Sequence, residues 1–392
     1  MKRRTPNDIY VAGIGMTPVG EHWEKSLRVL ALEAISAARA EAPSLAPQAL
    51  YVGNMLSGPL SGQLQLGALI ADFVGLRGIE AVTVEAAGAS GGLALRQAYL
   101  AIASGLQQVV LVLGVEKVTD RIGPKVEAAL AGGTDTDFEA SQGTTLAGQA
   151  ALLMRRYLHE SQAPADALAG FSIVAHANAV HNPCAYYRRA LRPEVYTQAA
   201  KLSEPLSVYD AAPYADGAAA LILARGHRLQ GDTHYPSVRI AASAVATSTV
   251  ALHDRKDPLW LSAASQSASD AYAQSGLTPE DIDLFELHDA FSIYAALTLE
   301  AAGFAPRGQG WRLARDGVIS LQGRLPICTF GGSKARGDAG GATGVYQLAE
   351  VTMQLQGRGG ANQVPEAKIG MAQCLGGAGS TAATHILVKE DG

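Results

Sequence analysis

The feature that most constrains the fold of this chain is an alternation of short apolar runs with segments of helical periodicity. The runs at 9–15, 81–85 and 108–113 are rich in Val, Ile, Leu and Ala. Strands that are buried on both faces of a parallel sheet have this near-continuous apolar character. Residues 26–40 follow the first run and carry apolar residues at helical spacing. The alternation therefore predicts an α/β protein with a parallel, layered sheet.

A second cycle of the same order begins near residue 236, with strands expected at 238–245 and 282–288. The repeated order predicts an internal duplication. We expect an N-terminal half at 1–235 and a C-terminal half at 236–392. The polar, helical stretch at about 118–203 interrupts the first cycle. We therefore predict that it forms an inserted loop domain within the first half.

Length, charge and cysteine content exclude several classes of protein. The chain has 392 residues, enough for two domains and a large core. Its net charge of −5, without a long run of one sign, argues against nucleic acid or an anionic membrane as the main partner. No apolar run reaches the length of a membrane span. Cys184, Cys328 and Cys374 are too few and too scattered for a disulfide framework or a metal site. A reducing cytoplasm is the expected location.

Four motifs in order carry a resemblance to a known family. They are the elbow Thr83–Gly92, the sequence His-Asp-Ala-Phe at 288–291, the Gly-rich loop 331–344 and the sequence Cys-Leu-Gly-Gly-Ala-Gly at 374–379. Together they resemble the thiolase superfamily, and specifically the branch related to sterol carrier protein X, over nearly the whole chain. The resemblance implies a five-layered α/β/α/β/α duplication with an inserted loop domain.

The resemblance also implies that the chain departs from ordinary thiolase chemistry. Thiolases carry a nucleophilic cysteine at the elbow, where this sequence has Gly88, and a glycine cannot carry an acyl group. Asp338 stands where the family has a histidine that takes the thiol proton. His288 remains to stabilise a thioester oxyanion, and Cys374 remains to move a proton at the α-carbon. The catalytic candidates are therefore His288, Cys374 and Asp338.

Several further residues are candidates for substrate binding: Gly88, Ser90, Phe291, Gly376, Arg188 and Arg189. The family uses the serine of its elbow structurally, so Ser90 is a poor substitute nucleophile. The two arginines could bind phosphates of coenzyme A or form a solvated face. Structural interpretations stay open for the catalytic candidates too. His288 could be a hydrogen-bonded core histidine, Cys374 a small buried hydrophobe and Asp338 a solvated loop acid.

The two positions that depart from the family, Gly88 and Asp338, would serve acyl transfer to the enzyme. The two groups that remain, His288 and Cys374, would serve thioester polarisation and proton transfer at the α-carbon. The leading hypothesis is an acyl-CoA enzyme that makes or breaks a carbon–carbon bond without an acyl-cysteine, as in an aldol or retro-aldol step. The alternatives are a non-catalytic acyl-CoA-binding or scaffolding subunit, and an acetyl-CoA acyltransferase with an unrecognised nucleophile. The resemblance implies a coenzyme A thioester as substrate or ligand, a homodimer and, as in some relatives, a small zinc-ribbon/OB-fold partner.

Overall fold

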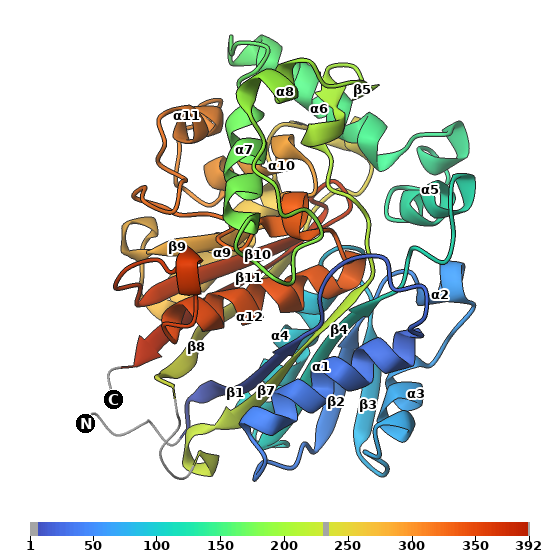
Figure 1. The fold of residues 1–392 in the computed structure, drawn as a ribbon, viewed down its shortest axis with the longest axis vertical. Coiled ribbons are helices and arrows are strands. Elements are labelled where there is room, and N and C mark those ends of the chain that lie inside the picture. The colour runs from blue at the N-terminus through green and yellow to red at the C-terminus, as the bar shows by residue number, and fades with distance from the viewer. Residues whose placement is uncertain (1–6, 230–234, 391–392) are drawn as a thin grey trace.

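The computed structural model describes residues 7–229 and 235–390. Five strands of the described chain form the first half of the sheet, at the bottom of Figure 1. In spatial order they are β3 (Glu80–Val84), β2 (Ala49–Gly53), β4 (Val109–Glu116), β7 (Gly217–Arg225) and β1 (Ile9–Met16). Strand β2 is parallel to β3 and β4, whereas β7 is antiparallel to β4 and β1.

The second half repeats this arrangement with four described strands. In spatial order they are β8 (Ser237–Thr247), β11 (Thr381–Glu390), β10 (Ile369–Gly376) and β9 (Leu284–Leu287). Strand β10 is parallel to β9, and β11 is antiparallel to both β10 and β8. The order β8-β11-β10-β9 thus matches β1-β7-β4-β2 of the first half, as a duplication predicts.

The two halves are joined at one edge rather than being separate sheets that only face each other. Strands β1 and β8 pair antiparallel through Tyr10 with Arg239 and Val11 with Val238, so the described strands form one nine-stranded sheet. Strand twist accumulates across a sheet, which allows the two ends of a continuous sheet to stack. Because the two halves share one sheet, the domain boundary that we expect between residues 235 and 236 stays a prediction.

Helices fill three layers around the two halves. Helices α1 (Leu27–Glu41) and α3 (Leu66–Phe73) pack on the outer face of the first half. Helices α4 (Ser90–Ala103) and α12 (Thr343–Leu355) lie between the halves and contact strands of both. Helices α9 (Ser262–Ser275) and α10 (Ser292–Ala301) cover the outer face of the second half. The order is α/β/α/β/α, and the predicted fold class is confirmed.

Strand β4 shows how the sequence produces these layers. Its side chains alternate between faces with a period of two. Val110 and Val112 enter the central core with α4 and α12, whereas Leu111 and Leu113 enter the outer core with α1. Both faces are therefore apolar, which explains the continuous apolar run in the sequence.

The segment between β4 and β7 adds no strand to the nine-stranded sheet. It contains helices α5 (Pro124–Ala131), α6 (Leu146–Glu160), α7 (Ala169–Ala179) and α8 (Pro193–Thr197), and a short pair, β5 (Lys201–Ser203) and β6 (Leu206–Ser207). In Figure 1 these green elements lie above the sheet, and α6 and α7 contact α10. The shorter helices α2 (Ser57–Ser61) and α11 (Gly310–Arg315) lie outside this segment. Across the described ranges, no helix has the length and apolarity that crossing a bilayer requires.

Candidate active site

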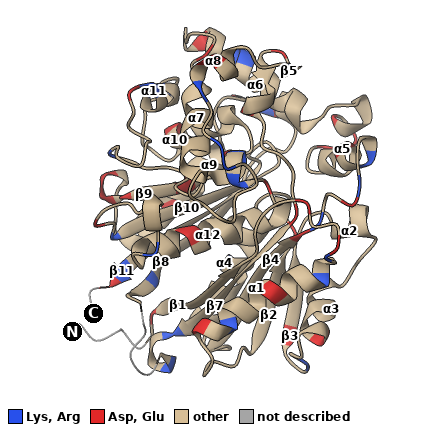
Figure 2. Cartoon of the chain, viewed as in Figure 1, with Lys and Arg blue, Asp and Glu red and all other residues tan. Residues whose placement is uncertain are grey.

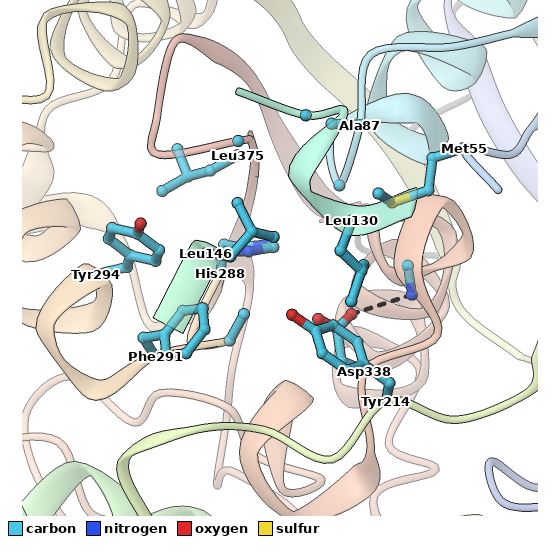
Figure 3. Close-up of a pocket in the computed structure, with 15 residues that line it drawn as sticks. Met55, Ala87, Leu130, Leu146, Tyr214, His288, Phe291, Tyr294, Asp338 and Leu375 are labelled. Carbon is cyan, nitrogen blue, oxygen red and sulfur yellow. Dashed lines mark hydrogen bonds between the residues drawn. The ribbon is translucent and has the colours of Figure 1, made fainter. Parts of the chain in front are cut away.

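A small pocket lies where the elbow, the ends of β9 and β10, the Gly-rich loop and the inserted segment meet (Figure 3). Its volume is about 40 Å³, which accommodates only about two or three waters in this conformation. The lining residues come from segments far apart in the sequence: Met55, Ala87, Gly88, Leu130, Gly133, Leu146, Tyr214, His288, Ala290, Phe291, Tyr294, Asp338, Gly340, Leu375 and Gly377. Gly88, His288 and Asp338, which come from three of the four motifs, are among them.

The elbow between β3 and α4 is held by Ser90. Its hydroxyl donates to the carbonyl of Ala87 at 2.6 Å and accepts from the backbone N–H of Ala86 at 2.9 Å. Ala87 has a positive φ of 49°, so this bond supports a turn that a non-glycine residue rarely adopts. Ser90 is fully buried and does not line the pocket. In this conformation Ser90 supports the elbow, and a role in substrate binding stays a prediction.

Gly88 leaves no free space for a side chain beside the pocket. A Cβ atom added to Gly88 would lie 2.7 Å from the carbonyl oxygen of Leu375 and 3.1 Å from Cε1 of His288. Carbon and oxygen atoms that are not bonded do not approach this closely without strain, and the oxygen belongs to the backbone. The imidazole of His288 thus occupies part of the room that a larger residue at position 88 would need.

His288 follows the end of β9 and is buried against the elbow. Burial lowers its pKa below the ordinary histidine value, although the carboxylates of Asp338 and Asp289 oppose this shift. The ring is therefore neutral at pH 7, with one nitrogen carrying a proton. Within the described residues its Nδ1 has no hydrogen-bond partner. A buried neutral imidazole in this state can donate to an oxygen that becomes negative during a reaction.

Asp338 lies on the opposite side of the pocket, just before α12. Its Oδ1 accepts from the Gly340 N–H at 3.1 Å and from the Thr343 hydroxyl at 2.9 Å. Its backbone N–H donates to the carbonyl of Pro213 at 2.8 Å. Among the described residues no donor reaches the other carboxylate oxygen, so that oxygen is available to a ligand.

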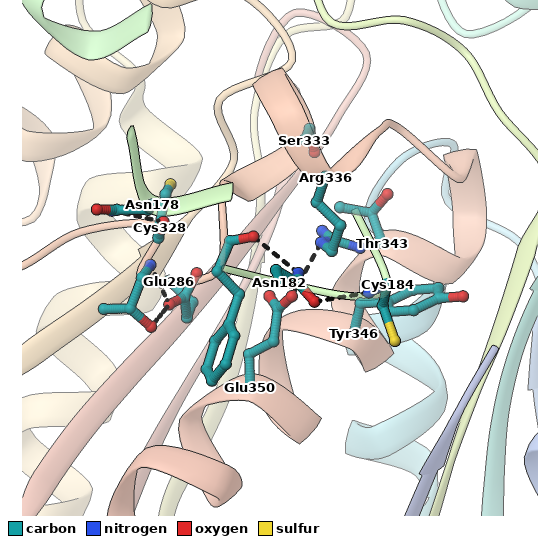
Figure 4. A network of polar contacts seen from close by, with 12 residues as sticks. Asn178, Asn182, Cys184, Glu286, Cys328, Ser333, Arg336, Thr343, Tyr346 and Glu350 are labelled. Carbon is teal, nitrogen blue, oxygen red and sulfur yellow. Dashed lines mark hydrogen bonds and ion pairs between the residues drawn. The ribbon is translucent and has the colours of Figure 1, made fainter. Parts of the chain in front are cut away.

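The Gly-rich loop that carries Asp338 is fixed by a buried polar network (Figure 4). Arg336 pairs with Glu350 at 3.0 Å and lies over the ring of Tyr346, 4.6 Å from its centroid. The Asp289 carboxylate accepts from the backbone N–H of Ser333 at 2.6 Å. Burial raises the pKa of Glu350, and the neighbouring Arg336 guanidinium opposes this. These contacts hold the loop from three sides and so set the position of Asp338.

Cys374 is not among the residues that line the pocket, and its role in proton transfer stays a prediction. Its Sγ points to the carbonyls of Ala89 at 3.7 Å and Ala383 at 3.9 Å. The next residue, Leu375, lines the pocket instead. Successive side chains of a strand point to opposite faces, so Cys374 and Leu375 cannot both face it. Burial raises the pKa of the Cys374 thiol to about 12, which leaves it protonated.

The structure places the other residues predicted for substrate binding in three different positions. Gly376 packs against the Ala86 carbonyl, which a Cβ on Gly376 would approach to 2.5 Å, and it is not among the pocket-lining residues. Arg188 and Arg189 line a separate cavity of the inserted segment. Phe291 lines the pocket, and its contact with substrate stays a prediction.

Sequence reasoning missed two tyrosines of the pocket, Tyr214 and Tyr294. Burial raises the pKa of both phenols, so both are protonated. The Tyr294 hydroxyl is buried, and no group of the described chain bonds to it. Tyr294 follows Phe291 of the motif by three residues, Phe291 is the N-cap of α10, and the two rings meet edge-on with centroids 5.7 Å apart. That spacing was the available signal.

The N-termini of two helices meet at the pocket. Gly88 precedes the first turn of α4, and Gly340 precedes the first turn of α12. A helix N-terminus carries a partial positive charge and free backbone N–H groups. The pocket therefore favours a ligand oxygen that carries or develops negative charge.

Comparisons with known proteins agree with this geometry. The thiolase N-terminal domain family matches residues 9–201, and the thiolase C-terminal domain-like family matches residues 244–389. An acetyl-CoA acetyltransferase of Methanothermobacter thermautotrophicus is 42% identical over 97% of this chain and 100% of its own length. Human sterol carrier protein 2 is 30% identical over 96% of this chain and 71% of its own length.

Solved structures show the same fold. The Ltp2-ChsH2(DUF35) aldolase superimposes with a TM-score of 0.82 at 25% identity, covering 98% of both chains. The Acat5 thiolase from Ascaris suum, solved in complex with coenzyme A, has a TM-score of 0.72 at 19% identity, covering 98% of this chain and 100% of that one. From its motifs, its fold and these relatives, the chain belongs to the thiolase superfamily and has relatives in the sterol carrier protein 2 branch.

Proposed function

We propose that this protein makes or breaks a carbon–carbon bond in a coenzyme A thioester without forming an acyl-enzyme. The observation that carries the proposal is the absence of a usable thiolate. Position 88 is a glycine with no room for a side chain, and none of the three cysteines lines the pocket. Burial raises the pKa of Cys184, Cys328 and Cys374 alike. An ordinary thiolase intermediate therefore has no atom on which to form.

The remaining groups suit an aldol or retro-aldol step on a β-hydroxyacyl-CoA. In the cleavage direction, the Asp338 carboxylate takes the proton of the β-hydroxyl, and the bond between the α- and β-carbons breaks. The electron pair moves into the thioester, whose oxygen becomes negative and accepts a hydrogen bond from His288. The Tyr294 phenol, which its raised pKa keeps protonated, then supplies a proton to the α-carbon, and the proton that Asp338 took passes to the Tyr294 phenolate, which restores both groups. The products are a carbonyl compound and a shorter acyl-CoA.

The relatives support this class of reaction without fixing it. The aldolase neighbour is named for carbon–carbon bond chemistry, and a coenzyme A complex is known for another thiolase of this fold. The pocket of about 40 Å³ is too small for an acyl group as it stands. We infer that Leu130 and Leu146, which the inserted segment contributes, move aside when substrate enters.

Partners are part of the proposal. Strand β3 is the open edge of the described sheet, with Val82 and, on the adjoining α4, Leu100 each more than 40% exposed. An uncovered edge strand with apolar neighbours is a pairing surface, so we propose a homodimer through β3. The aldolase neighbour is a complex with a DUF35 protein, which supports a small zinc-ribbon/OB-fold partner here.

A panel of β-hydroxyacyl-CoA substrates tests the reaction, with release of the carbonyl product as the readout, with and without a candidate partner. His288→Ala should lower kcat/KM by about two to three orders of magnitude, as the loss of other oxyanion donors does. His181→Ala, which removes an exposed histidine, is the matched control and should change nothing. Robust thiolysis of acetoacetyl-CoA by the wild type would contradict the proposal.

The acyl-CoA-binding subunit remains the second candidate, because the pocket is small and closed to an acyl chain in this conformation. Calorimetric titration with acyl-CoA separates the two. Binding without turnover of any substrate, with the partner present, would favour the binding subunit.

A further inference from the structure

A second, larger cavity lies within the inserted segment, beside the Gly-rich loop. Its volume is about 870 Å³, within the range of small-molecule sites. It lies between α7, the chain at 186–195 that follows it, and residues 208–213. Lys334 of the Gly-rich loop also lines this cavity, and no step proposed for the pocket uses this residue. The cavity therefore contains an amine without an assigned role.

The environment of Lys334 is unusual for a buried lysine. Only 1% of the residue is exposed, and no aspartate or glutamate of the described chain forms an ion pair with its ammonium group. Lys117 offers a direct comparison, since it is 3% exposed and pairs with Asp216 at 2.7 Å and with Asp120 at 2.5 Å. Buried charges are ordinarily paired in this way, because an unpaired charge loses its hydration. Lys334 lacks the ion pair that would stabilise its charged form.

The ammonium of Lys334 donates instead to two backbone carbonyls, those of Asp210 and Ala290. A neutral amine keeps two N–H groups for these carbonyls and directs its lone pair along the third direction. Loss of a proton therefore breaks neither hydrogen bond. Burial lowers the pKa of Lys334 to about 8, although Asp289 and Asp210 oppose this shift. About a tenth of the chains then carry a free amine at pH 7, about 200 times the fraction for a lysine with the ordinary pKa of about 10.4.

The amine of Lys334 lies close to the part of the cavity wall that His176 forms. Burial lowers the pKa of His176, and the charge of Lys334 lowers it further. His176 lines the cavity and stacks with Tyr187, with ring centroids 5.9 Å apart. A desolvated lysine at a cavity is the arrangement that forms imines with carbonyl compounds.

The opening of the cavity is basic. Arg188, Arg189 and Arg192 line it and are exposed. Figure 2 shows lysine and arginine gathered along the chain between α7 and α8, next to this cavity. No aspartate or glutamate lines the cavity, and none in the part of the chain described pairs with these arginines. Guanidinium groups bind carboxylates through paired hydrogen bonds. The opening therefore favours a carbonyl compound that also carries a carboxylate.

We propose that Lys334 forms a reversible imine with a small oxo acid, whose carboxylate is held by Arg188 and Arg189. The neutral amine attacks the carbonyl carbon and forms a carbon–nitrogen bond. This bond becomes double as the carbonyl oxygen leaves as water with both amine hydrogens. Addition of water reverses the step, so no oxidant or reductant takes part. The imine does not depend on carbon–carbon bond chemistry in the pocket, and either proposal can fail alone.

Trapping of the imine with sodium cyanoborohydride tests the proposal on the full chain at pH 7, with glyoxylate as the probe. The reagent delivers hydride to the imine carbon and leaves a carboxymethyl group on the nitrogen, which peptide mass spectrometry locates. Lys334 should be labelled about tenfold or more faster than the exposed Lys256, because more of its amine is free. The ion-paired Lys117 should stay unlabelled. Labelling of Lys334 no faster than that of Lys256 would overturn the proposal.

A neutral aldehyde and two double variants test the carboxylate site. Propanal is close to glyoxylate in size but has no carboxylate, so its preference for Lys334 over exposed lysines should be about tenfold smaller. Arg188→Ala/Arg189→Ala should slow glyoxylate labelling of Lys334 about tenfold at limiting probe, because hydrogen bonds to a charged group are lost. Labelling by propanal should not change in this variant. Arg28→Ala/Arg39→Ala removes the same charge from two exposed positions on α1 and should behave like the wild type. Equal preferences for the two probes, or equal losses in the two double variants, would overturn the assignment of an oxo acid.

Discussion

Gly88→Ala tests directly whether the elbow has lost the space for a nucleophile. The added Cβ would lie 2.7 Å from the Leu375 carbonyl oxygen and 3.1 Å from the ring of His288. The ring can turn, but the carbonyl is part of β10 and is fixed by strand pairing. We therefore expect the variant to fold with a strained elbow and a displaced imidazole.

The size of the effect follows from two opposing terms. Extra atoms in a well-packed core cost about 1–3 kcal/mol. Replacing glycine by alanine also stabilises the folded state by about 0.4–1 kcal/mol, because it lowers the conformational entropy of the unfolded chain. The net loss of unfolding free energy should be about 0–2.6 kcal/mol. Gly20→Ala is the control, since its added Cβ would meet only the Tyr186 ring at 3.4 Å, an ordinary contact.

Chemical denaturation of wild type, Gly88→Ala and Gly20→Ala gives the free energies. We expect Gly20→Ala to be slightly more stable than the wild type and Gly88→Ala to be less stable. Gly88→Cys extends the test, because its thiol should neither fit nor be acylated. Incubation with acetyl-CoA followed by intact-protein mass spectrometry reports acylation. A Gly88→Cys protein as stable as the wild type that accumulates an acyl group would refute the reasoning.

Three further outcomes follow from the site. Tyr294→Phe should lower the rate of carbon–carbon cleavage about 100-fold or more. Its unfolding free energy should stay the same or rise, because the lost hydroxyl has no partner in the described chain. An unaltered rate would remove Tyr294 from the mechanism. Cys374→Ala should cost about 1 kcal/mol of stability and leave the rate intact, since its sulfur faces away from the pocket; a large rate loss would return the cysteine to the site. Burial lowers the pKa of His288, so its ring stays neutral as the pH falls through the ordinary histidine pKa of about 6.5. We therefore expect kcat/KM to hold at pH 6.5 and to decline only at lower pH. An inflection near pH 6.5 that His288→Gln abolishes would contradict this.

The fold followed from the sequence because its signals are local and repeated. The helix expected at 26–40 is observed as α1, and the apolar run at 108–113 begins strand β4. What the sequence could not specify was how the two halves meet. The pairing of β1 with β8 joins residues 10 and 239, and no local pattern reports a contact over that distance.

The site was predictable at the level of segments but not of side-chain direction. Gly88, His288 and Asp338 converge because each closes a strand or opens a helix at one end of the sheet. Cys374 belongs to the right segment, yet a shift of one residue along β10 decides which face a side chain takes. The place of Arg188 and Arg189 in a separate cavity could not be predicted, because the inserted segment packs by tertiary contacts that its sequence does not reveal.

Buried polar groups without hydrogen-bond partners indicate whether the pocket is an inactive site or one that binds a ligand. The His288 Nδ1 atom and the Tyr294 hydroxyl are both buried, and neither has a hydrogen-bond partner within the described residues. A buried polar group left unsatisfied costs about 1–3 kcal/mol. Other such atoms exist in this chain, but these two share one small pocket that also holds a free carboxylate oxygen of Asp338. A pocket with no ligand to bind would gain stability if apolar residues replaced these two groups. Their retention together favours a ligand that supplies the missing partners, and so favours the acyl-CoA enzyme over a scaffold.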